Sequence, residues 1–259
     1  MGSCRSIKAN RPAAIYQSLK KMSGAANRKT IFITGATGYI GTRLIKLLLS
    51  NDYKVIALVR KGSEHKVPAG VETVIADPFD AQSFQQYIPS GSVFVQLLGV
   101  AHPSPKKAIQ FREIDLCSVK ASADAAAFAN ISQFIYVSVA MWPSKLMQAY
   151  QQVRKEGEEY CLSKKLSCTF IRPWYVLGPG HWWPILLLPL YGLAELIPAW
   201  RKQARAKGLV SIKQMLKTLL NAIVQEPSPL RIYEINDIRK AGLKKSSSMR
   251  TEQQQPSYL

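Results

Sequence analysis

The stretch KTIFITGATGYIGTRLIKLLLS, from Lys29 to Ser50, decides the fold. It begins with an apolar run, Thr30 to Thr34, that has the length of a short buried strand. A glycine turn follows the strand, and after it apolar residues recur at the spacing of a helix, at Ile40, Leu44, Leu47 and Leu48. A strand, a glycine turn and a helix in this order predict a dinucleotide-binding site.

The glycine turn suits a pyrophosphate for a physical reason. The first turn of a helix leaves N–H groups unpaired at the positive end of the helix dipole, and a phosphate can accept hydrogen bonds from them. Gly35 would form the tight turn, Gly38 would let phosphates approach the backbone, and Gly41 would let the helix pack on the strand. The alternative is a structural turn without a ligand. The candidate cofactor contacts here are Gly35, Thr37, Gly38, Tyr39, Ile40 and Gly41.

The glycine spacing in TGATGYIG is G-x-x-G-x-x-G and not G-x-G-x-x-G. In this form it resembles the short-chain dehydrogenase/reductase superfamily, in its extended or atypical branches, over roughly residues 29–238. The resemblance implies a Rossmann-like, doubly wound parallel α/β sheet with a small apolar C-terminal substrate region. We expect an NAD(P)-binding domain over residues 29–240, which includes a substrate or lid segment at 178–208, and a disordered tail at 241–259.

Composition limits the class of protein. The 259 residues are 47% hydrophobic, which suits one globular domain with a substantial core. Lys and Arg number 35 against 16 Asp and Glu, a net charge of +19 that suits a nucleic acid, an anionic membrane or an anionic cofactor. Nucleic acid is disfavoured because no known nucleic-acid-binding motif accompanies the charge. The four cysteines form no C-x-x-C pair, which indicates a reducing compartment such as the cytoplasm.

Residues 1–28 contain no acidic side chain and form a basic extension that we expect to be disordered. Three interpretations compete for it. It resembles an organellar transit peptide, its start MGSCRS fits a myristoylation pattern, and Met22 could be the true start of the protein.

The choice of cofactor depends on the end of the second predicted strand, Tyr53 to Val59. An acidic residue there would hold the ribose hydroxyls of NAD, whereas a basic residue accommodates the 2′-phosphate of NADP. The chain offers Arg60 and then Lys61, with no carboxylate before Glu64. We therefore expect NADP rather than NAD; the alternative is that these are solvated loop charges.

Further cofactor contacts are implied by the resemblance. Asp77 follows the third predicted strand, 71–76, and would face the adenine, while Phe79 would line the adenine pocket. Asp80 could instead cap a helix at 82–87. Gly99 ends the fourth strand, 92–98, where it is consistent with close approach of the nicotinamide ribose; the nearby His102 is a weaker candidate for binding phosphate or substrate. A long Ala-rich helix is expected at 108–130.

The candidate catalytic residues follow the fifth strand, 134–139. Ser138 lies at its carboxyl end and Tyr150 at the start of the next helix. In the superfamily the serine orients a carbonyl, the tyrosine transfers a proton, and a lysine four residues later lowers the tyrosine pKa. Here Arg154 takes the lysine position and Lys155 follows it. Arginine keeps the charge that could hold the ribose and lower the pKa of Tyr150, but it cannot share a proton relay. The alternative for Tyr150 is a packing role.

The second specific motif is RPWYVLGPG, which follows the sixth strand, 168–172, and resembles a segment beside the nicotinamide in extended members. It adds Pro173 and Val176 to the candidate cofactor contacts. The apolar stretch 182–200 contains three prolines and one charge, Glu195, which argue against a membrane span. It could form a lid over an apolar substrate, lie on an anionic membrane through 182–207, or pack as a core helix. A helix at 210–225 and a strand at 230–236 complete the chain.

Two functions of different class fit these features. The first is an NADPH-dependent oxidoreductase for a carbonyl or related group of a small apolar substrate, with Tyr150 as proton donor, Ser138 orienting and Arg154 tuning. The second is an NADP-binding protein without turnover, similar to nitrogen-regulator-type redox sensors or to the nucleotide-binding accessory subunit of respiratory complex I. A nucleotide-sugar epimerase is disfavoured by the short, apolar C-terminal region.

Overall fold

The computed structural model describes residues 29–101, 103–142, 147–180 and 209–243. The predictions for the basic extension, for His102, for the apolar stretch 182–207 and for the tail after Leu243 lie outside these residues. No helix within the described ranges combines the length and the apolar character that crossing a bilayer requires.

The described chain is built on one parallel sheet of seven strands in the order β3-β2-β1-β4-β5-β6-β9. The strand order reverses between β1 and β4, because the chain crosses from β3 at one edge back past β1. In such sheets ligands bind at the carboxyl edge beside this reversal. The predicted doubly wound fold is confirmed. The strands are β1 (Thr30–Thr34), β2 (Lys54–Val59), β3 (Glu72–Ile75), β4 (Val93–Gln96), β5 (Gln133–Val137), β6 (Cys168–Ile171) and β9 (Leu230–Tyr233).

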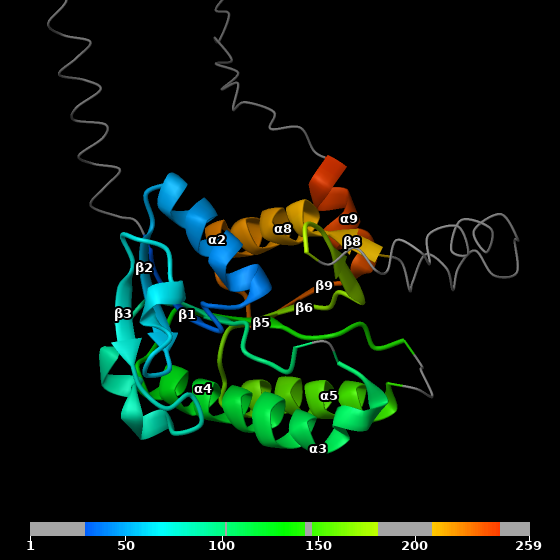
Figure 1. Ribbon diagram of the computed structural model, residues 1–259, viewed down its shortest axis with the longest axis horizontal. Coiled ribbons are helices and arrows are strands. Elements are labelled where there is room, and N and C mark those ends of the chain that lie inside the picture. The colour runs from blue at the N-terminus through cyan, green and yellow to red at the C-terminus, as the bar shows by residue number, and fades with distance from the viewer. Residues whose placement is uncertain (1–28, 102, 143–146, 181–208, 244–259) are drawn as a thin grey trace, which may run out of the picture.

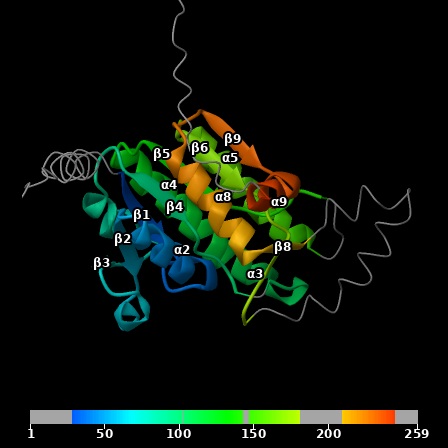
Figure 2. The ribbon, with the colours of Figure 1, turned by 90° about the horizontal axis from the view of Figure 1, so that it is seen from above.

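Helices cover both faces of the sheet, as Figure 1 shows. One face carries α2 (Tyr39–Ser50), α8 (Ile212–Val224) and α9 (Ile235–Leu243). Viewed from above, α2 and α8 run side by side across this face (Figure 2). The opposite face carries α5 (Gln148–Ser163) and a long helical segment made of α3 (Ala108–Gln110), a π-helical turn (Phe111–Leu116) and α4 (Cys117–Phe128).

The two faces have different cores. The α2 and α8 face is aliphatic, with Ile31, Ile33 and Val95 among its fully buried residues. On the α4 and α5 face, Phe32, Phe94 and Phe134 are register partners, and both neighbouring pairs of ring centroids are 5.2 Å apart. Each buried ring contributes about 1.5–3 kcal/mol. Helix α4 fits over this row because its sequence, CSVKASADAAAF, has mostly small buried residues.

The C-terminal part differs from the prediction in two places. Residues 209–211 form a short strand, β8 (Leu209–Ser211), which pairs in parallel with β7 (Tyr175–Leu177) inside the RPWYVLGPG segment. Helix α8 therefore begins only after Ser211, whose hydroxyl accepts a hydrogen bond from the Gln214 amide in a capping box. The last strand ends at Tyr233, and α9 follows it where a strand to residue 236 was predicted.

The segment predicted as a helix at 82–87 consists of two short 3-10 turns, Ala81–Ser83 and Gln85–Tyr87. Asp80 caps the first of them, because its Oδ1 accepts a hydrogen bond from the Gln82 amide at 3.0 Å. The predicted capping role of Asp80 is therefore confirmed, although the element it caps is shorter than expected.

Candidate functional site: the carboxyl edge of the sheet

Each of the three glycines of the turn is present for a different structural reason. Gly35 has a φ of 68°, and a Cβ on it would lie 2.7 Å from the carbonyl carbon of Leu97. A Cβ on Gly41 would overlap the Gly35 carbonyl oxygen and lie 2.9 Å from the Cα of Ala36. A Cβ on Gly38 would approach only the Gly35 oxygen, at 3.2 Å. Packing therefore requires glycine at 35 and 41, whereas Gly38 leaves its side of the turn open.

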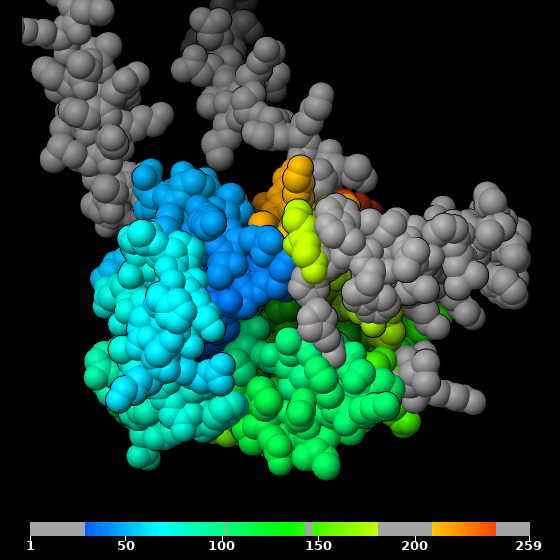
Figure 3. Space-filling view, viewed as in Figure 1, coloured from blue at the N-terminus to red at the C-terminus, as the bar shows by residue number. Residues whose placement is uncertain are grey.

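The start of α2 fits the phosphates of a dinucleotide. Gly38 is the N-cap residue, so no side chain caps the helix, and no acidic residue lies in the first turn. The first N–H groups of the helix consequently keep their capacity to bind an anion. The open side of Gly38 gives a phosphate the room to reach them. The space-filling view shows the surface hollowed between α2 and the helical segment α3–α4 (Figure 3).

The RPWYVLGPG segment closes one side of this turn. A Cβ on Gly178 would lie 2.6 Å from Cγ2 of Ile212 and would also overlap the Tyr39 hydroxyl, so this backbone packs directly against the start of α2. The Arg43 guanidinium lies 4.0 Å from the centroid of the Tyr39 ring and donates a hydrogen bond to the Pro179 carbonyl at 3.3 Å. The second sequence motif and the glycine turn therefore meet at one site, beside Val176 in β7.

At the predicted adenine end, the structure places three candidates on the surface. Arg60 is exposed directly after β2. Asp77 is exposed, and its Oδ1 accepts a hydrogen bond from the Phe79 amide at 2.9 Å. The Phe79 side chain is 43% exposed, which is unusual for a large aromatic residue. These three positions are compatible with an adenosine site, and their contact with a cofactor stays a prediction.

Helix α5 brings Ser138 and Tyr150 to the same end of the sheet. The Arg154 guanidinium donates to the Val137 carbonyl at 3.1 Å, just before Ser138. The Gln151 side-chain amide donates to the Ala140 carbonyl at 2.7 Å, just after it. The backbone on both sides of Ser138 is thus fixed to the helical turn that begins at Tyr150. The Ser138 side chain is buried, and no described residue forms a hydrogen bond with its Oγ.

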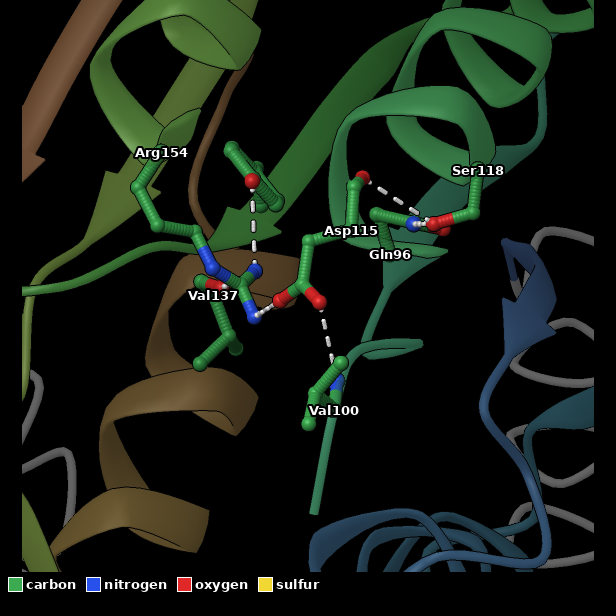
Figure 4. A network of polar contacts seen from close by, with 7 residues as sticks. Gln96, Val100, Asp115, Ser118, Val137 and Arg154 are labelled. Carbon is green, nitrogen blue, oxygen red and sulfur yellow. Dashed lines mark hydrogen bonds and ion pairs between the residues drawn. The ribbon is translucent and has the colours of Figure 1, made fainter. Parts of the chain in front are cut away.

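Arg154 lies in a buried ion pair that the sequence analysis did not foresee. Its Nη2 donates to Oδ1 of Asp115, and its Nη1 donates to the Tyr136 hydroxyl at 3.1 Å (Figure 4). Asp115 comes from the π-helical turn, and its Oδ2 accepts a hydrogen bond from the Val100 amide at 3.0 Å. Both side chains are almost inaccessible, at 7% for Arg154 and 0% for Asp115.

Gly99 was predicted to let the nicotinamide ribose approach the backbone, and it also makes room for the Arg154–Asp115 ion pair. A Cβ at this position would lie 2.8 Å from Oδ1 of Asp115 and would overlap the guanidinium of Arg154. A glycine is therefore needed here for the pair to pack against the loop after β4. The predicted contact of Gly99 with a cofactor stays a prediction.

The ionisation of Tyr150 differs from the prediction. Burial raises the pKa of Tyr150 above its ordinary value, and this effect outweighs the neighbouring Arg154 guanidinium, which lowers it. Asp115 and Tyr175 raise the pKa further. The expected direction of the arginine's influence is correct, but the expected net lowering of the Tyr150 pKa is wrong, because the residue is almost fully enclosed and its cation is already paired.

A second buried polar cluster connects this ion pair to the glycine turn. Gln96, at the end of β4, contacts the Thr34 hydroxyl at the end of β1, and its amide donates to the Ser118 hydroxyl at 3.2 Å. Ser118 in turn donates to the Asp115 carbonyl at 3.1 Å. Sequence reasoning missed Gln96 and Asp115. The available signal was a polar residue inside an apolar strand, VFVQ, and an acidic residue between Ile114 and Leu116.

A family model described as NAD(P)H-binding matches residues 35–178, from the glycine turn through the RPWYVLGPG segment. The chain belongs to this NAD(P)H-binding family. It fits the extended or atypical part of the short-chain dehydrogenase/reductase superfamily, as the relatives below indicate. The chain therefore carries an NAD(P)H-binding domain.

A curated relative is the ceramide reductase of Caulobacter vibrioides, 24% identical over 225 residues, which cover 86% of this chain and 69% of that protein. A solved structure of UDP-galactose 4-epimerase aligns with a TM-score of 0.61 and 16% identity, covering 82% of this chain and 81% of that chain. The structure of MoeE5 with UDP-glucose and NAD aligns with a TM-score of 0.60 and 14% identity, covering 81% and 79% respectively. At these identities the structural likeness establishes the fold alone.

Proposed function

We propose that this protein is an NADPH-dependent oxidoreductase that reduces a carbonyl or related group of a small apolar substrate. Tyr150 donates the proton, Ser138 orients the carbonyl, and Arg154 tunes the site. A bound reduced nicotinamide would supply the hydride. The residues of this chain would bind the cofactor, align the carbonyl and deliver the proton.

The observation that carries this proposal is the state of Ser138. A buried hydroxyl normally finds a hydrogen-bond partner, and one without a partner is costly. Ser138 Oγ is enclosed at the carboxyl edge of the sheet, beside the helical turn of Tyr150, and no described residue bonds to it. A substrate carbonyl would supply the missing partner at the point where a proton donor is also present.

The apolar character of the substrate is supported by two observations. The ceramide reductase relative carries in its name a reduction of a lipid substrate. The sequence places an apolar stretch at 182–200 directly after the segment that packs on the glycine turn. We propose that residues 178–208 cover the substrate. Contact of 182–207 with an anionic membrane is a separate proposal, which co-sedimentation with phosphatidylserine vesicles would test.

Replacing Tyr150 with phenylalanine tests the enzymatic proposal. The variant should lose NADPH consumption with a suitable apolar carbonyl compound while it keeps its affinity for NADP, because the hydroxyl alone is removed. Tyr160 lies on the same helix and bonds to Asp124 at 3.0 Å, so Tyr160→Phe is the matched control and should keep its turnover. Unchanged NADPH consumption in Tyr150→Phe would reject the assignment of the proton donor.

The preference for NADP is tested by thermal-shift titration with NADP and NAD. A cofactor that binds the folded state raises the apparent stability by an amount that grows with the logarithm of its concentration relative to its dissociation constant. We expect the larger shift with NADP, since Arg60 follows β2 where no carboxylate is present. Equal shifts would overturn this interpretation of Arg60.

A second candidate, an NADP-binding protein without turnover, is favoured by the geometry of Arg154. Its guanidinium is bound to Asp115, Tyr136 and Val137, so it is not a free cation beside the phenol. Under this alternative, Tyr150→Phe would leave both cofactor affinity and cellular function unchanged. The two candidate functions are therefore distinguished by the effect of Tyr150→Phe, which abolishes NADPH consumption under the first and changes nothing under the second.

A further inference from the structure

The charges that face Tyr150 form a balanced set. Tyr150 packs on Phe111 of the π-helical turn with 4.8 Å between ring centroids, and the Arg154 carbon Cζ lies 5.0 Å from the centroid of the Tyr150 ring. The titratable groups that act on it from the neighbouring elements are Asp115 in the π-helical turn and Tyr175 in β7, besides Arg154 on its own helix. Tyr136 of β5 lies on the other side of the guanidinium.

Arg154 and Asp115 are the two charged partners of this set; burial raises the pKa of the Asp115 carboxyl, and the Arg154 guanidinium opposes that effect. An arginine side chain keeps its proton at all accessible pH values. A guanidinium at this distance, alone and buried, would favour the negatively charged phenolate of Tyr150. The ion pair with Asp115 places one negative charge against it, so the described surroundings of Tyr150 carry no net formal charge. The guanidinium still favours the phenolate, but Asp115 and burial oppose it.

We propose that Asp115 is a positioning residue that partly neutralises Arg154 and so opposes ionisation of the Tyr150 hydroxyl, which favours the site as a proton donor for carbonyl reduction. This inference rests on the proposed function for the role of Tyr150. It adds the residue that opposes the influence of Arg154 on that hydroxyl.

The carboxylate of Asp115 is held in this role from several sides. The π-helical turn delivers it, the Val100 amide donates to its Oδ2 at 3.0 Å, and the missing Cβ of Gly99 leaves it room. Its own backbone carbonyl accepts from Ser118 at 3.1 Å. With one oxygen on the guanidinium and the other on a backbone amide, the carboxylate cannot turn away from Arg154 without losing both bonds (Figure 4).

The proton balance of the step is simple. The carbonyl carbon is reduced by the hydride of a reduced nicotinamide, the O–H bond of Tyr150 breaks, and its proton goes to the carbonyl oxygen. The phenolate that remains regains a proton from water. A site that holds Tyr150 protonated begins this step in the required state. The reverse oxidation would need Tyr150 as a phenolate, which burial and Asp115 both disfavour.

The first test compares the full chain with its Tyr150→Phe variant by ultraviolet difference titration, which follows the absorption of tyrosinate. The proposal predicts that the two titration curves coincide up to about pH 10, the ordinary pKa of a tyrosine, because Tyr150 stays protonated over this range. A phenolate that forms near neutral pH in the parent protein and is absent from the variant would overturn the proposal.

The second test removes the negative charge with Asp115→Asn. The uncompensated guanidinium should then move the ionisation of one tyrosine to lower pH by about 1 to 3 pH units, the effect of an opposite charge within roughly 4–6 Å. The signal should disappear in the double variant Asp115→Asn/Tyr150→Phe. Glu113→Gln is the matched control, because Glu113 is exposed in the same π-helical turn, and it should leave the titration unchanged.

An Asp115→Asn protein that folds and shows no such shift would overturn the proposal. If the variant does not fold, a phenolate near neutral pH in the parent protein, measured in the first test, still overturns the proposal. Neither readout requires turnover, so a failure of the proposed oxidoreductase activity is seen separately, as absence of NADPH consumption in a protein whose Tyr150 titrates as expected.

Discussion

The glycine turn and the Arg154–Asp115 pair lie at the same carboxyl edge of the sheet, yet they treat polar groups in opposite ways. The turn leaves the first N–H groups of α2 without a side-chain cap or an acidic neighbour. Around Arg154, a buried carboxylate, a tyrosine hydroxyl and a backbone carbonyl accept hydrogen bonds from the two terminal guanidinium nitrogens, and only Nε has no partner among the described residues. The first arrangement is open to a ligand, whereas the second is closed by the protein itself.

This difference teaches that the positive charge nearest Tyr150 is a structural charge. In the glycine turn, the absence of a side chain at Gly38 leaves space in which a phosphate can bind. Around Arg154, an acidic residue, Asp115, pairs with the cation and reduces its effect on the surroundings. Removing a charge of the buried pair should therefore change stability, whereas filling the open side of the turn at Gly38 should change affinity for the cofactor.

The largest effect is expected from Asp115→Ala. It leaves the Arg154 charge buried without its partner, which should lower the free energy of unfolding by about 3–5 kcal/mol. Chemical denaturation measures this loss. The double variant Asp115→Ala/Arg154→Met removes both charges and should recover most of the stability. A double variant no more stable than the single one would show that the charge is not the cause.

The next effect is expected from Gly41→Ala. The new Cβ would overlap the Gly35 carbonyl and lie 2.9 Å from the Ala36 Cα, so backbone has to shift. We expect a loss of about 1–3 kcal/mol in the free energy of unfolding. Thermal denaturation without cofactor isolates this effect from ligand binding, and a melting temperature equal to that of the parent protein would contradict the packing role of Gly41.

Gly38→Ala should act on affinity and leave the fold intact. Its Cβ would meet only the Gly35 oxygen, at 3.2 Å, but it would occupy the open side of the turn. We expect the dissociation constant for the dinucleotide to rise about tenfold, equivalent to ~1.4 kcal/mol. Isothermal titration calorimetry measures it, and Gly41→Ala provides the contrast of a variant with impaired stability.

Arg60→Ala should weaken the binding of NADP by a few-fold to about tenfold while the binding of NAD changes little. The side chain is exposed after β2, and an exposed charge contributes modestly. Lys213→Ala on α8 is the matched control, since it removes an exposed positive charge from a different part of the surface. An equal loss of affinity for both cofactors would place Arg60 away from the 2′-phosphate.

The smallest effect is expected from Lys155→Ala, directly beside Arg154. Lys155 and Glu159 form an exposed pair one helical turn apart, 3.7 Å between charged atoms. Such pairs change the free energy of unfolding by less than about 0.5 kcal/mol. Denaturation of Lys155→Ala beside Asp115→Ala would therefore compare an exposed and a buried ion pair at adjacent positions of one helix.

Much of the fold could be predicted from the sequence because its signals are local. The spacing of glycines and apolar residues predicted β1, the turn and α2 with little error. The apolar run ending at Val59 predicted β2, with a start one residue early. The paired strands β7 and β8 could not be predicted, because residues 175 and 209 are far apart in the chain and the pairing leaves no local pattern.

The resemblance to the superfamily pointed to Ser138, Tyr150 and Arg154, and their catalytic roles stay predictions. Their electrostatic surroundings could not be predicted from the sequence. Asp115 is 39 residues from Arg154, and it reaches the guanidinium only through the π-helical turn, which has no clear signature in the letters FREIDL. The direction of the Tyr150 pKa depends on burial and on that partner, and therefore required the tertiary structure.

The π-helical turn at Phe111–Leu116 has a consequence for how such a site can arise. A π turn accommodates one residue more than an α turn, so it is equivalent to a single-residue insertion that the helix absorbs without breaking. Removing one residue there would rotate the preceding part of the helix by about 100° relative to α4. The Phe111 contact with Tyr150 and the Asp115 contact with Arg154 could then no longer coexist. Deletion of a single residue would therefore remove the acidic partner of Arg154.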